Sequence, residues 1–321
     1  MVIEHRALGK SGLSLPILGL GGTGLTGVAA TEAADLVAAA LRAGVDYFDT
    51  APFYGMGESE ARLGAALGGV GTPVIVSTKV GRLLDEPAQA GAAHTCHFDY
   101  SYSATMRSLE TSLTRLARPR VDIVLVHDLS PRWHGDRLRD RFEEAIKGAF
   151  PALRRLRDEG TIGAFGIGVN DCAVCLKALD QTPLDLVMLA GRATLIDTAG
   201  FRELLPRCQK EGVGVIAAAP FNSGILATGA REGAHYFYEP ASAGVLQRVR
   251  RIEVICDQHG VVLAAAALQI ALRHPAVTCV LPGPRSATEL GRNLQLLEAK
   301  IPDAFWRALR SAGLIGDEVP D

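Results

Sequence analysis

A chain of 321 residues with 48% hydrophobic and 21% charged residues can bury a large core, which excludes an intrinsically disordered protein. The formal net charge of −2 and the lack of a basic tract argue against nucleic acid as a partner. The first residues lack the pattern of a signal peptide, and no uncharged apolar run is long enough to span a bilayer, so we expect a cytoplasmic protein that does not enter the membrane.

The first elements predicted along the chain are a hairpin and a glycine-rich turn. Residues 3–15 alternate between polar and apolar side chains with glycines at the turns, which indicates a β-hairpin. A strand over 17–20 follows, and the glycines of 19–24 then match the spacing of a dinucleotide-binding fingerprint. A Rossmann unit, however, places its third glycine in the first turn of the helix, whereas the helix cap expected here is Thr31. We therefore interpret the glycine run as a loop.

The rest of the chain alternates between strand and helix patterns without a break in composition. The strands predicted after the first one are 45–48, 74–78, 122–126, 162–167, 185–189, 213–217 and 277–281. The predicted helices are 31–43, 57–67, 101–117, 138–159, 171–180, 200–211, 242–258, 261–273 and 286–298. Eight short apolar strands that alternate with helices predict an α/β fold in which a parallel sheet closes as a single (β/α)₈ TIM barrel. We expect one domain over residues 1–321.

Three connections are long enough to act as lids or substrate walls at the mouth of such a barrel, namely 80–99, 128–137 and 228–241. Trp133 and the aromatic run 236–238 lie in two of them. These rings offer either a surface on which a sugar stacks or packing for the loops themselves, and the sequence favours neither.

The six cysteines are spread widely and do not resemble a disulfide framework. Cys172 and Cys175 have the spacing of a redox motif but lack the surrounding residues of a thioredoxin-like site, so we interpret them as small apolar residues near a helix start. His94, Cys96 and His97 lack a second ligand pair at zinc-like spacing, so we interpret them as loop residues and expect no metal.

Four polar residues follow strand ends and together indicate proton transfer. Asp49 ends the strand 45–48, Tyr54 lies in the next loop, and Lys79 and His127 each follow a later strand. Transfer of a hydride to or from an oxygen-bearing carbon requires a proton transfer at that oxygen. We expect Tyr54 to perform it with a pKa lowered by Lys79, Asp49 to pair with Lys79, and His127 to orient the substrate.

These four residues, with the run Phe-Asp-Thr-Ala-x-x-Tyr-Gly around the first two, resemble the catalytic tetrad and signature of the aldo-keto reductase superfamily. The resemblance extends to about Phe305. It implies an oxidoreductase with a TIM barrel, an N-terminal hairpin below the barrel, and a nicotinamide cofactor across its mouth.

The same resemblance implies where the cofactor binds. Residues 220–226 are similar to the family's pyrophosphate loop, and 281–286 with Asn293 are similar to its adenosine-binding segment. The residues expected to contact the cofactor are Gly21, Thr23, Asn170, Pro220, Phe221, Asn222, Gly224, Leu226, Gly283, Arg285, Ser286, Glu289 and Asn293.

This chain departs from the family at several cofactor positions. Gly283 and Glu289 stand where many members carry the lysine and arginine that hold the 2′-phosphate of NADP, and Arg285 is the one cation left nearby. A carboxylate repels that phosphate, so we expect NAD to be favoured by ~1–3 kcal/mol, roughly 5–150-fold, with NADP still possible. Ala190 and Ala218 replace a glutamine and a stacking tyrosine, so the nicotinamide pocket is remodelled.

Three further segments, 98–101, 189–195 and 221–229, resemble the branch of the superfamily that contains aldose 1-dehydrogenases and pyridoxal 4-dehydrogenase. This implies oxidation of the anomeric hydroxyl of a sugar of the L-fucose, L-galactose or D-arabinose type to a lactone, with Tyr54 as base. Oxidation of pyridoxal, which also forms a cyclic hemiacetal, is the alternative, and general aldehyde or ketone reduction is another. A non-catalytic subunit that senses nicotinamide is less favoured, because all four tetrad residues are present.

Overall fold

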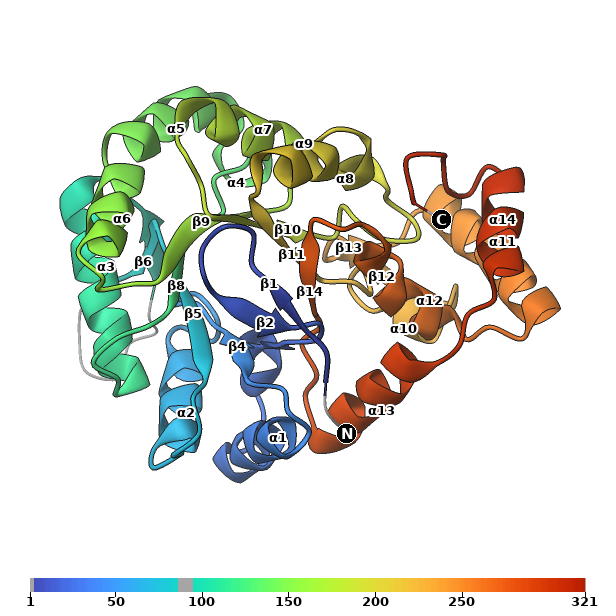
Figure 1. Cartoon of the computed structure of the whole chain (residues 1–321), viewed down its shortest axis with the longest axis horizontal. Helices are drawn as coiled ribbons and strands as arrows, with labels where there is room; N and C mark the ends of the chain where they lie inside the picture. Colours follow the sequence, from blue (N-terminus) through green and yellow to red (C-terminus); the bar gives the residue numbers. More distant parts are fainter. Residues whose placement is uncertain (1–2, 86–94, 321) are drawn as a thin grey trace.

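The computed structural model describes residues 3–85 and 95–320, and its centre is a sheet of eight strands surrounded by helices (Figure 1). Neighbouring strands pair in parallel throughout this sheet. Along the chain the strands are β3 (Leu20–Gly21), β4 (Tyr47–Asp49), β5 (Ile75–Val80), β8 (Ile123–His127), β9 (Ala164–Val169), β10 (Leu186–Ala190), β11 (Gly214–Ala218) and β14 (Val277–Leu281). A parallel bridge between Leu18 and Val280 joins the two ends of the sheet. The predicted TIM barrel is confirmed.

The strands of the barrel alternate between its interior and its outer layer. In β8, Ile123 and Leu125 belong to the cluster of side chains that fills the barrel, whereas Val124 and Val126 pack with the helices. Successive residues of a strand point to opposite faces, so a strand covered on both faces reads as a continuous apolar run. This is why short apolar runs identified most of the strands.

An N-terminal hairpin closes the bottom of the barrel. β1 (His5–Ala7) pairs antiparallel with β2 (Ser14–Pro16) (Figure 1). Leu8 and Leu15 of this hairpin complete the interior cluster. Thr278 at the start of β14 donates a hydrogen bond from Oγ1 to the carbonyl of Ala7 at 3.0 Å. The hairpin therefore covers the amino ends of the strands and leaves their carboxyl ends to form a site.

Helices follow most strands, and several differ from the predicted ones in their bounds. They are α1 (Ala30–Arg42), α2 (Glu58–Leu67), α3 (Tyr102–Leu116), α4 (Pro131–His134), α5 (Leu138–Lys147), α6 (Ala149–Asp158), α7 (Cys172–Gln181), α8 (Ala199–Arg202), α9 (Leu204–Glu211), α10 (Ile225–Thr228), α11 (Ala243–His259), α12 (Leu263–Gln269), α13 (Ala287–Glu298) and α14 (Asp303–Ser311). The helix α14 was not predicted; it buries Phe305, Trp306 and Leu309 on one face.

Two predicted helix bounds were wrong for clear physical reasons. The region 138–159 is broken into α5 and α6 at Gly148, where a Cβ atom would come within 2.5 Å of the carbonyl oxygen of Tyr100. Helix α1 begins at Ala30 rather than after a Thr31 cap, because the carboxylate of Glu32 accepts the free N–H of Ala29 at 2.9 Å.

The three connections expected as long loops contain short elements. Within 80–99, β6 (Arg82–Leu84) pairs antiparallel with β7 (Cys96–Phe98), while His94 lies outside the described residues. The segment 128–137 holds α4 and a 3₁₀ turn, η2 (Gly135–Arg137). The segment 228–241 forms a second hairpin from β12 (His235–Tyr236) and β13 (Glu239–Pro240). Each connection thus contains regular secondary structure in its described part.

The cysteines are free thiols, and burial raises the pKa of Cys172, at the start of α7, to about 11. Among residues 3–85 and 95–320, no group of three or more histidine, cysteine, aspartate and glutamate side chains could hold a metal ion. In the same part of the chain, no helix is long and apolar enough to cross a bilayer.

Candidate active site

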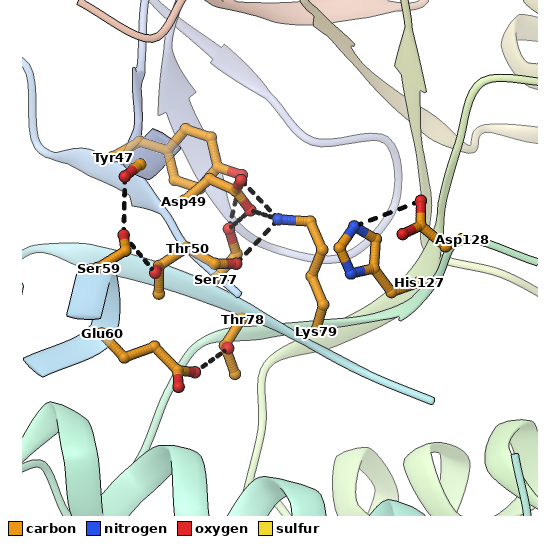
Figure 2. Close-up of polar contacts among 11 residues, drawn as sticks. Tyr47, Asp49, Thr50, Ser59, Glu60, Ser77, Thr78, Lys79, His127 and Asp128 are labelled. Atoms are coloured by element: carbon orange, nitrogen blue, oxygen red, sulfur yellow. Dashed lines mark hydrogen bonds and ion pairs between the residues drawn. The ribbon is translucent and has the colours of Figure 1, made fainter. Parts of the chain in front are cut away.

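The carboxyl ends of β4, β5 and β8 bring Asp49, Lys79 and His127 together (Figure 2). The ammonium of Lys79 donates to both carboxylate oxygens of Asp49, at 2.8 and 2.6 Å, and to the carbonyl of Thr50 at 2.8 Å. Asp49 and Lys79 are each 2% exposed. An ammonium has three protons to donate, so Lys79 is fully satisfied by these partners.

Two residues that the sequence analysis did not assign support the carboxylate of Asp49. Ser77 Oγ donates to Asp49 Oδ1 at 2.7 Å, and the hydroxyl of Tyr47 lies 2.9 Å from Ser77 Oγ. Because the proton of Ser77 points to Asp49, Tyr47 donates to Ser77. Tyr47 and Ser77 lie two residues before Asp49 and Lys79 on the same strands, so the strand period of two was the signal that could have identified them.

Tyr54 is held by a tight turn between β4 and α2. Its N–H donates to the carbonyl of Ala51 at 3.1 Å, and its carbonyl accepts from Ser59 at 3.2 Å. Residues 55–57 all have positive φ, which the glycines at both ends of this run make possible. The ring of Tyr54 lies 4.7 Å from Lys79 Nζ and 5.9 Å, edge to face, from the ring of His127.

The expected lowering of the Tyr54 pKa by Lys79 is wrong for this structure. Burial raises the pKa of the Tyr54 phenol well above its usual value, and the carboxylates of Asp49 and Asp128 raise it further. All three N–H groups of Lys79 donate to Asp49 and Thr50. The negative charge of Asp49 therefore offsets the effect of the ammonium on the phenol. Tyr54 therefore keeps its proton at neutral pH and can donate it to an oxygen in the cavity.

His127 stays neutral over the whole physiological range. Burial lowers the pKa of its imidazole to about 4, an effect that Asp128 opposes and that Lys79 and Arg82 reinforce. Its Nδ1 is buried without a hydrogen-bond partner among the described residues, and its Nε2 lies 3.7 Å from Asp128 Oδ1. A neutral imidazole carries one donor and one acceptor, so His127 can orient a hydroxyl or a carbonyl oxygen.

Two connected cavities open at this end of the barrel. The smaller, of about 400 Å³, is lined by the four tetrad residues and by Phe53, Trp133 and Tyr238. The larger, of about 940 Å³, extends towards α13. The residues that line both cavities are Thr23, Asn170, Ala190, Ala219, Tyr238 and Gly283. Of the aromatic rings whose role the sequence left open, Trp133 lines the smaller cavity, Phe237 the larger, Tyr238 both and Tyr236 neither.

Most residues expected to contact a cofactor line the larger cavity, namely Thr23, Asn170, Pro220, Phe221, Asn222, Gly224, Gly283, Arg285, Glu289 and Asn293. Gly21 lines the smaller cavity. The side chain of Leu226 is fully buried in the core and lines neither cavity. Ser286 is the cap of α13, where its Oγ accepts from the N–H of Glu289 at 3.2 Å, and it lines neither cavity.

The sequence analysis missed two arginines that line the larger cavity. Arg231 and Arg292 line it together with Arg285, so Arg285 is not the one cation nearby. Arg231 follows α10 and Arg292 lies on α13, three residues after Glu289, so both come from parts of the chain where sequence spacing gave no signal.

The larger cavity fits an extended dinucleotide. Three arginines among its lining residues suit the negative charges of a pyrophosphate. Asn222 is 4% exposed, and its Oδ1 is buried without a hydrogen-bond partner among the described residues, which leaves an acceptor for a ligand hydroxyl or amide. At Gly283 a Cβ atom would lie 2.5 Å from Thr23 Oγ1, so a side chain at this position would have to displace that of Thr23.

Comparison with known proteins identifies the family. The aldo/keto reductase family model matches residues 17–313, more than half of the chain. The chain belongs to the aldo/keto reductase family. As a member it is an oxidoreductase, and the cofactors of aldo/keto reductases are nicotinamide nucleotides.

Individual relatives of this aldo/keto reductase include dehydrogenases. A pyridoxal 4-dehydrogenase of Microbacterium luteolum is 39% identical, over 97% of this chain and 98% of its own. A D-threo-aldose 1-dehydrogenase of a Pseudomonas species is 35% identical, over 96% and 97%. The holo form of an aldo-keto reductase from Bacillus halodurans shares the fold with a TM-score of 0.80, at 24% identity over 96% of each chain.

Proposed function

We propose that this protein is an aldose 1-dehydrogenase that oxidises the anomeric hydroxyl of a cyclic sugar to a lactone with NAD. One observation carries the proposal: a phenol, an ammonium–carboxylate pair and a neutral imidazole meet in a cavity of about 400 Å³ that continues into a larger, arginine-lined one. Bound nicotinamide would accept the hydride from the anomeric carbon. The protein must then remove one proton from the anomeric oxygen.

In this proposal Tyr54 is the base that accepts that proton. His127 holds the same oxygen from the other side through its ring nitrogen. Asp49 and Lys79 act on Tyr54 rather than on the sugar: Asp49 holds the ammonium of Lys79 in place 4.7 Å from the centre of the Tyr54 ring. The proton passes from the sugar hydroxyl to the phenolate oxygen while the hydride leaves the carbon, so charge and atoms balance.

A raised Tyr54 pKa makes a specific pH prediction. Only the phenolate can accept a proton, and its fraction grows tenfold per pH unit below the pKa, so kcat/KM for oxidation should rise close to tenfold per unit from about pH 7 to about pH 9. His127, with its pKa of about 4, adds no step in this range. Initial rates in buffers of constant ionic strength test this, and a plateau below about pH 8 contradicts it.

A panel of substrates tests the proposed function. Reduction of NAD should be measured with L-fucose, L-galactose, D-arabinose and pyridoxal, each over a range of concentrations. The proposal predicts the highest kcat/KM for one of the sugars. The lactone should appear in equal amount to the reduced cofactor.

Pyridoxal oxidation is the second candidate, favoured by the 39% identity to a pyridoxal 4-dehydrogenase. The aromatic residues that line the smaller cavity include Phe53, Trp133 and Tyr238. Their rings can stack on a flat aromatic ring such as that of pyridoxal as readily as on the face of a sugar. A kcat/KM for pyridoxal that exceeds that of every sugar by about tenfold or more would replace the first candidate with this one.

The cofactor preference depends on Glu289. Its Oε2 accepts the N–H of Arg285 at 2.8 Å, and its own N–H donates to Ser286, so the carboxylate is fixed at the wall of the larger cavity. It would repel a 2′-phosphate and accept hydrogen bonds from a free ribose hydroxyl. Arg231, Arg285 and Arg292 oppose it, so we propose that NAD is favoured by about fivefold, about 1 kcal/mol.

Two variants test this preference. Glu289→Arg should reverse the cofactor preference in favour of NADP. Glu289→Gln keeps a side chain that can cap the helix, and its ratio of kcat/KM for NAD to kcat/KM for NADP should lie between those of the wild type and Glu289→Arg. The measurement is kcat/KM for each cofactor. A wild type that prefers NADP, or a ratio unchanged in both variants, would rule out the role of Glu289.

A further inference from the structure

Asp128 follows His127 directly and lines the smaller cavity, although the sequence analysis assigned it no role. Its Oδ2 accepts from Arg82 Nη1 at 2.7 Å. Its Oδ1 lies 3.7 Å from His127 Nε2, too far for a strong hydrogen bond. One oxygen of this carboxylate thus keeps its capacity to accept a hydrogen bond at the cavity wall.

The backbone at Asp128 is held in an unusual conformation. Its φ is 55°, in the left-handed region, where aspartate and asparagine are tolerated better than other side chains that carry a Cβ. Its N–H donates to the carbonyl of Gly168 at 3.2 Å, and its own carbonyl accepts from Ser130 at 2.8 Å. This conformation aims the carboxylate at the cavity beside His127.

Arg82 fixes the direction of that carboxylate. It is 6% exposed and comes from β6, in a connection expected to be a loop. Its guanidinium carbon lies 3.1 Å from the ring centre of Phe53, 4.3 Å from that of Trp133 and 5.2 Å from that of Phe98. A guanidinium enclosed by three rings has little freedom to turn, so its hydrogen bond holds Asp128 in one orientation.

The negative charge of Asp128 acts on the phenol of Tyr54, because it contributes to the raised pKa of that group. A substrate oxygen that contacts Tyr54 and His127 therefore brings its neighbouring atoms towards Asp128. In an aldose, the carbon next to the anomeric carbon carries a hydroxyl, and a hydroxyl donates strongly to a carboxylate. A substrate without it leaves the carboxylate oxygen desolvated and unpaired.

We infer that Asp128 is a specificity-determining residue that accepts a hydrogen bond from the hydroxyl on the carbon adjacent to the reacting one, and that Arg82 positions it. This inference rests on the proposed oxidation of an aldose. It narrows the substrates to sugars that keep the 2-hydroxyl, and it disfavours simple aldehydes and 2-deoxy sugars.

Three sugars test the inference in the wild type. L-Galactose carries all its hydroxyls, 2-deoxy-L-galactose lacks the one next to the anomeric carbon, and L-fucose lacks the distant one at carbon 6. Loss of the 2-hydroxyl should lower kcat/KM by roughly 30–100-fold, the range of a hydrogen bond to a charged group, whereas loss of the 6-hydroxyl should cost less than about tenfold.

A variant separates recognition from structure. Asp128→Asn keeps the shape and tolerates the left-handed backbone, but its amide is a weaker acceptor. Loss of the charge changes the Tyr54 pKa for both sugars alike. The variant should therefore lower the ratio of kcat/KM for L-galactose to kcat/KM for 2-deoxy-L-galactose by roughly 30-fold. Arg82→Lys replaces the planar guanidinium with an ammonium, so Asp128 is held less firmly. It should lower the same ratio of kcat/KM values, by a smaller factor.

A matched control is Asp85→Asn, on the same hairpin as Arg82. Asp85 pairs with His97 and Thr95 across that hairpin, so its loss disturbs the hairpin without touching Asp128. This control variant should change kcat/KM for the two sugars by equal factors. Equal losses for both sugars in Asp128→Asn would show a merely structural role and overturn the inference, while the proposed function would stand. A wild type that oxidises none of the three sugars would contradict the proposed function, and the inference with it.

Discussion

Tyr54→Phe should lower the turnover of sugar oxidation by a factor on the order of 10²–10⁴ while cofactor binding persists. The substitution keeps the ring that packs 4.7 Å from Lys79 Nζ and removes only the hydroxyl that is proposed to exchange the proton. Steady-state kinetics give turnover, and a titration of protein fluorescence with NAD gives the dissociation constant. The rise of the rate with pH should vanish in the same variant.

A control uses a tyrosine outside the cavities. Tyr102 lies on the surface at the start of α3, where its hydroxyl accepts from Arg155 at 3.0 Å. Tyr102→Phe should leave turnover within about threefold of the wild type, as surface changes usually do. Wild-type turnover in Tyr54→Phe would show that another group moves the proton.

Lys79→Met should lower the free energy of unfolding by about 3–5 kcal/mol and abolish most activity. The substitution leaves the carboxylate of Asp49 buried without its partner, and breaking a buried pair in this way costs more than removing both members. The substitution also removes the ammonium that lies 4.7 Å from the Tyr54 ring, and a nearby positive charge favours the phenolate that acts as base. Urea unfolding measures the first effect and kinetics the second.

The double variant Asp49→Asn with Lys79→Met is the matched control. It removes both charges, so it should recover much of the stability lost by Lys79→Met, although activity stays low. A single variant that costs less than about 1 kcal/mol, or a double variant whose loss equals the sum of the two single ones, would show that the pair is not coupled as the structure indicates.

The barrel could be predicted because its strands are covered on both faces. The run 123–126 is apolar at each position and 277–281 at each position but Thr278, and that pattern identifies a strand without knowledge of its partners. Helix breaks were harder, because Gly148 ends a helix through the approach of Tyr100 from a distant part of the chain. Short hairpins such as β6–β7 carry too few residues for a period to show.

The positions of the four tetrad residues could be predicted from the ends of the strands, whereas the pKa of Tyr54 could not. The sequence places Lys79 near Tyr54, but the pKa of the phenol depends on how the three N–H groups of Lys79 are shared, and they all go to Asp49 and Thr50. The Arg82–Asp128 pair joins strand β6 to the end of β8 across 46 residues of sequence, so only the folded chain reveals it.

Transfer of deuterium from the sugar to the cofactor tests the central proposal most directly. A sugar labelled with deuterium at the anomeric carbon should be incubated with wild-type protein and NAD, and the reduced cofactor analysed by mass spectrometry. Hydride transfer predicts one deuterium in each reduced cofactor, with an equal amount of unlabelled lactone. Reduced cofactor without the label, or label released to water, would contradict direct hydride transfer from the anomeric carbon.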